Sequence, residues 1–357
     1  MASGVIAGNR IEFLGAGGPK MESAGLKKLV DFEALPVSGF GDVLPRYFTL
    51  RKNFDVLKKA LENPLCKGLV AIDYPGFNMK LTAVANRLDK PVLYVAPPQA
   101  WAWKPKRAQK LSHPKNLLAV FFEFEKSPYF KAGCKIIHLE HPLVNAIDQE
   151  SAGEESRLNK KERILIFPGS RKGQTLRNLP LFLEIANNVF PSVELVVVAS
   201  RAEIKNAVES YLQRHRCKTS NLQVMESPRK ASERLRFFRD SSLALSVPGT
   251  VTLELSLAGC NTVVCAKPDF LTYLMGKLLL KTPWLSLPNL ILGKALFSEY
   301  ILSGSAIKKK KAIQKSLLEN FKTPLQKKDV EELRKSLRRG LQAEQLMSEF
   351  LAQFLQG

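Results

Sequence analysis

The sequence lacks paired cysteines, long apolar runs and a recognisable signal peptide. Its five cysteines are an odd number in 357 residues and include no CxxC pair. This argues against a disulfide framework and a zinc knuckle, and favours a reducing compartment. No apolar run approaches the roughly 18–20 residues of a transmembrane helix. Residues 1–10 lack the charged flank and apolar core of a secretory signal. These absences predict a cytoplasmic protein.

Acidic residues are also scarce relative to basic ones. The chain has 54 Lys+Arg against 33 Asp+Glu, a formal net charge of +21, while its 45% hydrophobic content is ordinary for a globular protein. So basic a chain is expected to attract nucleic acid, acidic lipid or phosphorylated small molecules. Charge alone does not choose among these partners.

Short apolar runs rich in β-branched and aromatic residues alternate with helix-like stretches. This rhythm is typical of parallel strands whose connecting helices cover both faces of a sheet. Strands are predicted at residues 11–14, 68–72, 92–95 and 117–121, and at 163–167, 193–199, 242–246 and 262–266. Helices are predicted at 175–189, 202–214, 308–339 and 344–355. The predicted fold class is therefore α/β, with two doubly wound halves.

A polar, acidic interval at residues 149–161 separates the two halves. We therefore predict an N-terminal Rossmann-like domain at 1–150, a second one at 151–335, and a terminal helix at 336–357 that packs back across the domains. Because a strand-turn, IEFLGAGGPK, follows ten unpatterned residues, the first βα unit is expected to be absent.

Two predicted strand-to-helix junctions favour anion binding. Residues 169–175, GSRKGQT, do not form a Walker loop, but helix N–H groups and Arg171 would converge there on an anion. In residues 247–254, VPGTVTLE, Gly249 would permit close backbone approach and Thr250 would cap the helix and contact phosphate. Glu254 would accept hydrogen bonds from sugar hydroxyls, although a capping box explains this segment equally well. Together the junctions indicate a nucleotide diphosphate.

Four further residues have two possible roles each. Asp73 follows a predicted strand, where partial burial would suit a general base, but composition alone favours a turn or helix cap. Trp101 and Trp103, beside basic residues, form either an aromatic platform for a sugar or lipid phosphate or a packed loop. His141 is either catalytic or, as is commoner for a lone histidine, structural.

Two apolar and basic stretches, at residues 36–61 and 270–284, interleave aromatic side chains with lysines and arginines. Either stretch suits an interfacial helix on an anionic membrane, and either suits a protein core. The mixture of aromatic and basic residues slightly favours the lipid surface.

Five motifs occur in one order: IDYPGFN at 72–78, WAW at 101–103, PGSR at 168–171, PGTVTLE at 248–254 and LSLPNLILG at 285–293. With them the chain resembles the lipid A disaccharide synthase family from about Ile11 to its end. The resemblance implies a GT-B fold, in which two Rossmann-like halves face a central cleft. It also implies an inverting glycosyltransferase that needs neither metal nor cofactor. The implied reaction transfers 2,3-diacylglucosamine from its UDP conjugate to the 6-hydroxyl of 2,3-diacylglucosamine 1-phosphate.

The resemblance also assigns roles to domains and residues. The N-terminal domain would bind the acceptor and face the membrane, and the second domain would bind the UDP-sugar. Asp73 would be the catalytic base, and Asn78, Trp101 and Trp103 would face the acceptor. The UDP-sugar would be bound by Ser170, Arg171, Gly249, Thr250, Glu254 and Asn289. The enzyme would work as a peripheral protein on the anionic cytoplasmic face of the inner membrane. A homodimer is left open, and nucleic acid is not expected as a partner because no recognised binding module is present.

The sequence departs from the family pattern at three places. No AGExSGD loop precedes the first recognised strand, Glu140 replaces a glycine before His141, and Gln174 stands where an acidic residue usually follows PGSR. The alternative prediction is therefore a catalytically impaired, UDP-binding and membrane-associated remnant of the family.

Overall fold

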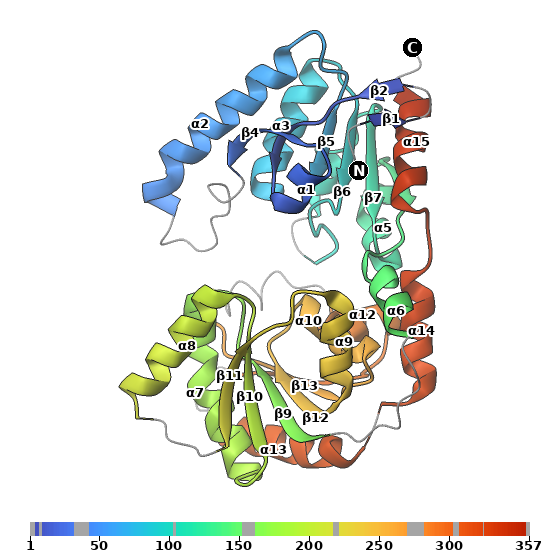
Figure 1. The fold of residues 1–357 in the computed structure, drawn as a ribbon. Helices are drawn as coiled ribbons and strands as arrows, with labels where there is room; N and C mark the ends of the chain where they lie inside the picture. Colours follow the sequence, from blue (N-terminus) through green and yellow to red (C-terminus); the bar gives the residue numbers. More distant parts are fainter. Residues whose placement is uncertain are drawn as a thin grey trace. The chain divides into compact units, whose positions relative to one another are not determined.

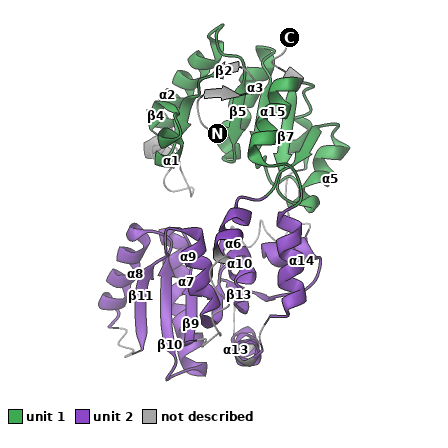
Figure 2. Ribbon diagram, turned by 45° about the vertical axis from the view of Figure 1, so that its right-hand side comes forward, with its two compact units in different colours: residues 1–140, 339–357 green, residues 141–338 purple. Residues whose placement is uncertain are grey.

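A computed structural model describes residues 4–6, 9–31, 43–102, 105–151, 161–216, 221–269, 282–302, 307–323 and 325–354. The chain forms two compact units (Figure 2). Unit 1 combines Met1–Glu140 with Arg339–Gly357, and unit 2 is His141–Arg338. The first domain was predicted to end at residue 150, whereas the N-terminal part of unit 1 ends at Glu140. Among the described residues, no helix has both the length and the apolar character needed to cross a membrane.

The main sheet of unit 1 is parallel, in the order β5 (Leu69–Ile72), β6 (Val92–Val95), β7 (Asn116–Val120) and β8 (Lys135–His138) (Figure 1). Every residue of β6 and β7 is buried, which explains their nearly continuous apolar sequences. The strands are connected by α3 (Pro75–Arg87), α4 (Lys106–Gln109) and α5 (Glu123–Lys131). This is the predicted alternation of strand and helix.

The N-terminal segment of unit 1 contains two smaller sheets. In one, β1 (Gly4–Ile6) pairs antiparallel with β2 (Asn9–Ile11). In the other, β3 (Leu14–Gly17) pairs parallel with β4 (Lys27–Asp31), across α1 (Pro19–Ser23). The single strand predicted at 11–14 is therefore wrong, because the chain changes pairing partner between Ile11 and Leu14. The long helix α2 (Val43–Glu62) follows.

The C-terminal helix α15 (Ala343–Phe354) completes the core of unit 1. Its apolar face packs against strands β6 and β7, in a cluster that joins Leu346, Met347, Phe350 and Leu351 to Leu93, Val95, Leu117 and Ala119. The segment before it is tied to the end of β8, since the Leu341 N–H donates to the His138 carbonyl at 2.9 Å. Gly340 has φ +103°, and a Cβ there would collide with that carbonyl. The terminal helix thus docks within unit 1, and its predicted packing across the domains stays a prediction.

Unit 2 contains a six-stranded parallel sheet in the order β11-β10-β9-β12-β13-β14. Its strands are β9 (Lys161–Phe167), β10 (Glu194–Ala199), β11 (Leu222–Glu226), β12 (Ser241–Ser246), β13 (Thr262–Ala266) and β14 (Ser298–Ile301). From β9 the chain first adds strands on one side and then returns to add β12 on the other. The sheet therefore has a topological switch point between β9 and β12, and ligands of doubly wound proteins bind at the carboxyl ends of such strands.

The described helices of unit 2 are α6 (Leu143–Ser151), α7 (Lys172–Val189), α8 (Ala202–Arg214), α9 (Ala231–Arg239), α10 (Thr250–Leu257), α12 (Leu287–Leu292), α13 (Ile307–Lys322) and α14 (Lys327–Leu337). The core joins α7, α8 and α13 to the central strands. The helical region predicted at 308–339 is divided into α13 and α14, and Pro324 lies in the sequence between them. Proline lacks the N–H that a continuous helix would need there.

Candidate functional site at the switch point

The two predicted anion-binding junctions leave neighbouring strands at the switch point of unit 2. Ser246, the last residue of β12, pairs with Phe167, the last residue of β9. The Val247 N–H then donates to the Phe167 carbonyl at 3.0 Å, so the two loops start side by side. Arg171 belongs to the loop after β9, and Gly249 to the loop after β12. Residues about 80 positions apart in sequence thus flank one edge of the sheet.

The loop after β9 directs the N-terminus of α7 toward this edge. Gly169 has φ +144°, and the Gln174 side chain lies where a Cβ at Gly169 would stand. The Thr175 hydroxyl donates to the Gly169 carbonyl at 3.0 Å and holds the turn against the helix. Ser170 and Arg171 are exposed, and Arg171 is the N-cap residue. The first N–H groups of a helix have no intrahelical acceptor, so they are available to an anion here.

The loop after β12 differs from its prediction in one detail. Gly249, and not Thr250, is the N-cap residue of α10, with extended backbone. The Thr252 hydroxyl donates to the Gly249 carbonyl at 2.7 Å, and no described side chain caps an N–H group at the start of this helix. Thr250 is the exposed first residue of the helix, and no described atom lies within 4 Å of a Cβ built at Gly249. Both residues leave this helix terminus accessible.

Glu254 is held by an arginine that the sequence analysis missed. The Arg234 Nε lies 2.6 Å from Glu254 Oε2, and both side chains are largely buried. Arg234 also donates to the carbonyls of Pro228 and Arg229, at 3.0 Å each, which fixes the guanidinium. No described residue hydrogen-bonds the second carboxylate oxygen, Oε1. Glu254 is thus oriented through one oxygen, and no local sequence pattern connects it with Arg234.

Asn289 lies inside unit 2 with its amide fully hydrogen-bonded. Its Nδ2 donates to the Phe297 carbonyl and to Glu299 Oε1, both at 2.8 Å, and its Oδ1 accepts from the Phe297 N–H at 2.9 Å. Glu299 also accepts from the N–H groups of Leu285 and Ser286, at 2.7 and 2.9 Å. This geometry explains the SLPN motif as a turn built on a half-buried carboxylate. It gives Asn289 a positioning role in that turn.

In unit 1, Asp73 lies at the carboxyl end of β5, as predicted, but it is exposed. The expected burial is therefore wrong within this unit. Asp73 and Tyr74 have φ of 47° and 45°, which is the left-handed region. The Asn78 side chain donates to the Asp73 carbonyl at 2.8 Å and the Tyr94 hydroxyl donates to it at 3.1 Å. Asn78 thus supports the backbone that carries Asp73.

Trp101 packs edge-on against Phe124, with ring centroids 4.7 Å apart. Beside it, burial raises the pKa of Glu125, while the N–H groups of Phe121 and Phe122 and the Trp101 indole oppose that shift. The packed-loop alternative therefore describes Trp101 within unit 1. Trp103 lies outside the described residues.

His141 is mostly buried, and burial lowers its pKa to about 4. Its Nδ1 accepts the Leu143 N–H at 3.2 Å at the start of α6. The imidazole is therefore neutral near pH 7 and holds a local turn.

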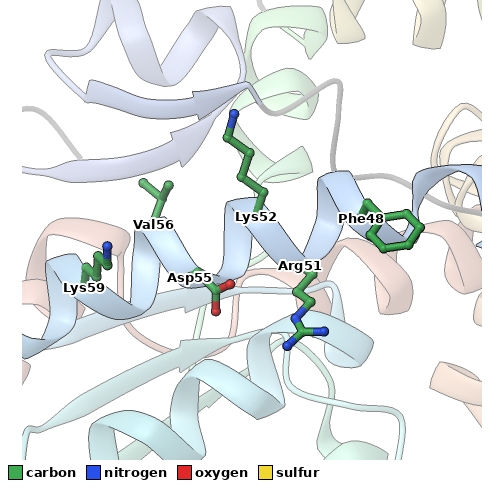
Figure 3. A pocket seen from close by; sticks show the side chains of 6 residues that line it. All are labelled: Phe48, Arg51, Lys52, Asp55, Val56 and Lys59. Carbon is green, nitrogen blue, oxygen red and sulfur yellow. The ribbon is translucent and has the colours of Figure 1, made fainter.

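The first apolar and basic stretch contributes to the core through one face of α2, and its membrane alternative stays a prediction. On the inner face, Phe54, Leu57 and Leu61 pack against α3 and β4. The outer face borders a shallow hollow lined by Phe48, Arg51, Lys52, Asp55, Val56 and Lys59 (Figure 3). Phe48 is 77% exposed there. Residues 36–42, and residues 270–281 of the second stretch, lie outside the described parts of the chain.

Comparisons with known proteins agree with the motif resemblance. A family model described as lipid-A-disaccharide synthetase matches residues 6–354. The lipid-A-disaccharide synthase of Geobacter metallireducens is 30% identical over 299 residues, which cover 82% of this chain and 76% of that protein. The corresponding Aquifex aeolicus protein is 31% identical over 297 residues, covering 82% of this chain and 80% of that protein.

A solved structure shows the fold alone. The UDP-GlcNAc 2-epimerase from Neisseria meningitidis, bound to UDP-GlcNAc, has a TM-score of 0.56 at 13% identity, over 93% of this chain and 87% of that one. Together with the two parallel sheets, this likeness confirms the α/β class and the GT-B fold. Since the family model spans nearly the whole sequence, the chain belongs to the lipid-A-disaccharide synthase family.

Proposed function

We propose that the chain is a hexosyltransferase that makes the lipid A disaccharide. The donor is UDP-2,3-diacylglucosamine and the acceptor is the 6-hydroxyl of 2,3-diacylglucosamine 1-phosphate. The products are the β(1→6) disaccharide 1-phosphate and UDP. The observation that carries this proposal is the pair of helix N-termini at the switch point of unit 2, which combine Arg171 with the oriented carboxylate of Glu254.

The donor site acts by stabilising the leaving group. As the bond from the anomeric carbon to UDP breaks, negative charge develops on the diphosphate. The Arg171 guanidinium and the N–H groups at the starts of α7 and α10 supply fixed donors for that charge. Ser170 and Thr250 add hydroxyls at the same edge. Glu254, through its Oε1, accepts hydrogen bonds from ribose hydroxyls.

Asp73 activates the acceptor. Its carboxylate takes the proton of the 6-hydroxyl while the oxygen attacks the anomeric carbon, opposite the departing UDP. One C–O bond forms as another breaks, and the configuration at the anomeric carbon inverts. Because Asp73 is exposed in unit 1, its carboxylate is accessible to an acceptor.

Both substrates carry acyl chains, so the enzyme works as a peripheral protein on the anionic cytoplasmic face of the inner membrane. The exposed Phe48 beside Arg51 and Lys52 supports this attachment, since aromatic and basic side chains together suit a headgroup region. A homodimer remains a prediction.

The test is an assay of the purified protein with both acylated sugars and a chelator, with mass spectrometry of the disaccharide 1-phosphate. We expect product from the unaltered protein and a loss of kcat/KM of about 100-fold in Arg171→Ala, the usual size for removal of a transition-state donor. Asp73→Asn should lose kcat at unchanged KM for the donor.

Arg201→Ala is the matched control. Arg201 is also the N-cap residue of a helix after a strand, but it follows β10 and not a strand at the switch point. Equal losses in the two arginine variants would contradict the donor site. UDP binding without any product would support the alternative of a catalytically impaired remnant.

A further inference from the structure

The turn that carries Asp73 has an unusual backbone. Asp73 and Tyr74 are consecutive non-glycine residues with positive φ. Steric contact between Cβ and the following carbonyl makes this region unfavourable for L-residues, so it is rarely occupied twice in succession. Such a conformation persists only where its surroundings determine it, and it concentrates at functional sites.

The surroundings of this turn act on its backbone. The Tyr94 hydroxyl, from the adjacent strand β6, donates to the Asp73 carbonyl at 3.1 Å. Asn78 Nδ2, from the first turn of α3, donates to the same carbonyl at 2.8 Å and to the Ile72 carbonyl at 3.0 Å. The Asp73 N–H donates to the Val95 carbonyl at 2.9 Å. Both peptide groups of Asp73 are therefore fixed, while its carboxylate stays exposed.

The Tyr94 side chain is fixed in a position that keeps its hydroxyl at the Asp73 carbonyl. Its side chain is completely buried in the core of unit 1, so the phenol cannot swing away without leaving a cavity. Burial, and then the nearby Asp73 charge, raise the pKa of Tyr94. The hydroxyl therefore keeps its proton and remains a donor over the working pH range.

We infer that Tyr94 is a positioning residue for the base: its hydroxyl holds Asp73 in the left-handed turn and so sets the direction of the carboxylate. This inference rests on the proposed function. The backbone direction at Asp73 determines where the Cβ points, and a relaxed turn would move the carboxylate away from the acceptor hydroxyl.

The test is Tyr94→Phe, which removes one oxygen and keeps the ring. A misplacement of a reacting group by about 1 Å can cost about 100-fold in rate. We therefore expect kcat to fall by about 10- to 100-fold, with little change in KM for either substrate. In an Asp73→Asn background the same substitution should have no further effect on kcat, because Tyr94 acts through Asp73.

Tyr129→Phe is the matched control for stability. Tyr129 lies in the same core cluster, and its buried hydroxyl donates to the Pro98 carbonyl. The two variants should lose similar thermal stability, so a large difference between them in Tm would identify an unfolding effect. A crystal structure of Tyr94→Phe should show the Asp73 carboxylate displaced from its position in the unaltered protein.

Two results would overturn the inference. One is an unchanged kcat in Tyr94→Phe, and the other is an equal fall in kcat with and without Asp73. If the unaltered protein makes no disaccharide, the proposed function fails by itself. The crystal structures then still decide whether Tyr94 sets the position of Asp73, since an undisplaced carboxylate contradicts the inference.

Discussion

His141 is a neutral imidazole held in a mostly buried position, and its ionisation links stability to pH. Its pKa is about 4 in the folded chain, against about 6.5 in an unfolded one. Above pH 6.5 neither state is protonated, so the residue has no effect. As the pH falls below 6.5 the unfolded state binds the proton first, and stability is lost until the pH reaches about 4.

Replacing His141 should remove this part of the pH dependence. At pH 5 the linkage amounts to about 2 kcal/mol. Urea unfolding should be measured for the unaltered protein and for His141→Asn at both pH values. From pH 7.5 to pH 5, the free energy of unfolding of the unaltered protein should fall by about this amount relative to that of the variant. His215→Asn is the control, because His215 is exposed. Parallel pH profiles for the unaltered protein and His141→Asn would contradict the assignment.

At the residue scale, sequence reasoning succeeded where the chemistry is local. A strand followed by glycine, a polar residue and a helix is visible in the sequence, and both junctions lie at the switch point. Arg234, Glu299 and Tyr94 were missed, since their partners lie on other elements. The position of Asp73 after a strand was predicted correctly, but its exposure depends on packing that the sequence does not show.

The end of helix α8 carries a residue type that the local backbone conformation disfavours. Helix α8 ends at Arg214, and Arg216, two residues later, has φ +49°. Glycine usually occupies a left-handed position after a helix, because it lacks the Cβ that clashes there. Arg216 is exposed. Arg216→Gly should therefore raise the free energy of unfolding by about 1 kcal/mol.

Chemical denaturation of two variants tests this. Arg214→Gly places glycine inside the last turn of the same helix, where it should lower stability by about 1 kcal/mol. The opposite signs separate a backbone effect from the loss of a positive charge, which both variants share. A loss of stability in both would show that the Arg216 side chain outweighs its strained backbone.

At the element scale, the strands found from the sequence are central ones, except β5, which lies at an edge of its sheet. Strands β6 and β13 and helix α8 have the predicted bounds, and β9, β10 and β12 differ by one or two residues. Three missed strands, β8, β11 and β14, each lie at an edge of a sheet. These three strands are covered less completely, and their sequences have no long apolar run. KIIH, LQVME and SEYI are accordingly only partly buried.

At the scale of the whole molecule, unit 1 is formed from both ends of the chain, and its last helix, α15, comes after all of unit 2 in the sequence. The polypeptide builds its parallel sheet, then forms unit 2, and supplies α15 only at the end. The amphipathic pattern of the terminal helix was readable in the sequence. Its docking surface on β6 and β7 was not, because those strands are apolar on both faces and do not show which helix covers which face.

Truncating the α15 anchor should therefore destabilise unit 1 selectively. Phe350 is almost completely buried against this sheet, and removing a buried phenylalanine ring costs about 3–5 kcal/mol. In Phe350→Ala, amide hydrogen exchange should accelerate in β6 and β7, while β9 and β12 of unit 2 keep their protection. Leu318→Ala is the control: Leu318 is 51% exposed on α13, and its loss should change stability by about 0.5 kcal/mol or less. Equal acceleration in both sheets would mean that the two units unfold together, and protection retained in β6 would mean that α15 contributes little to the core it covers.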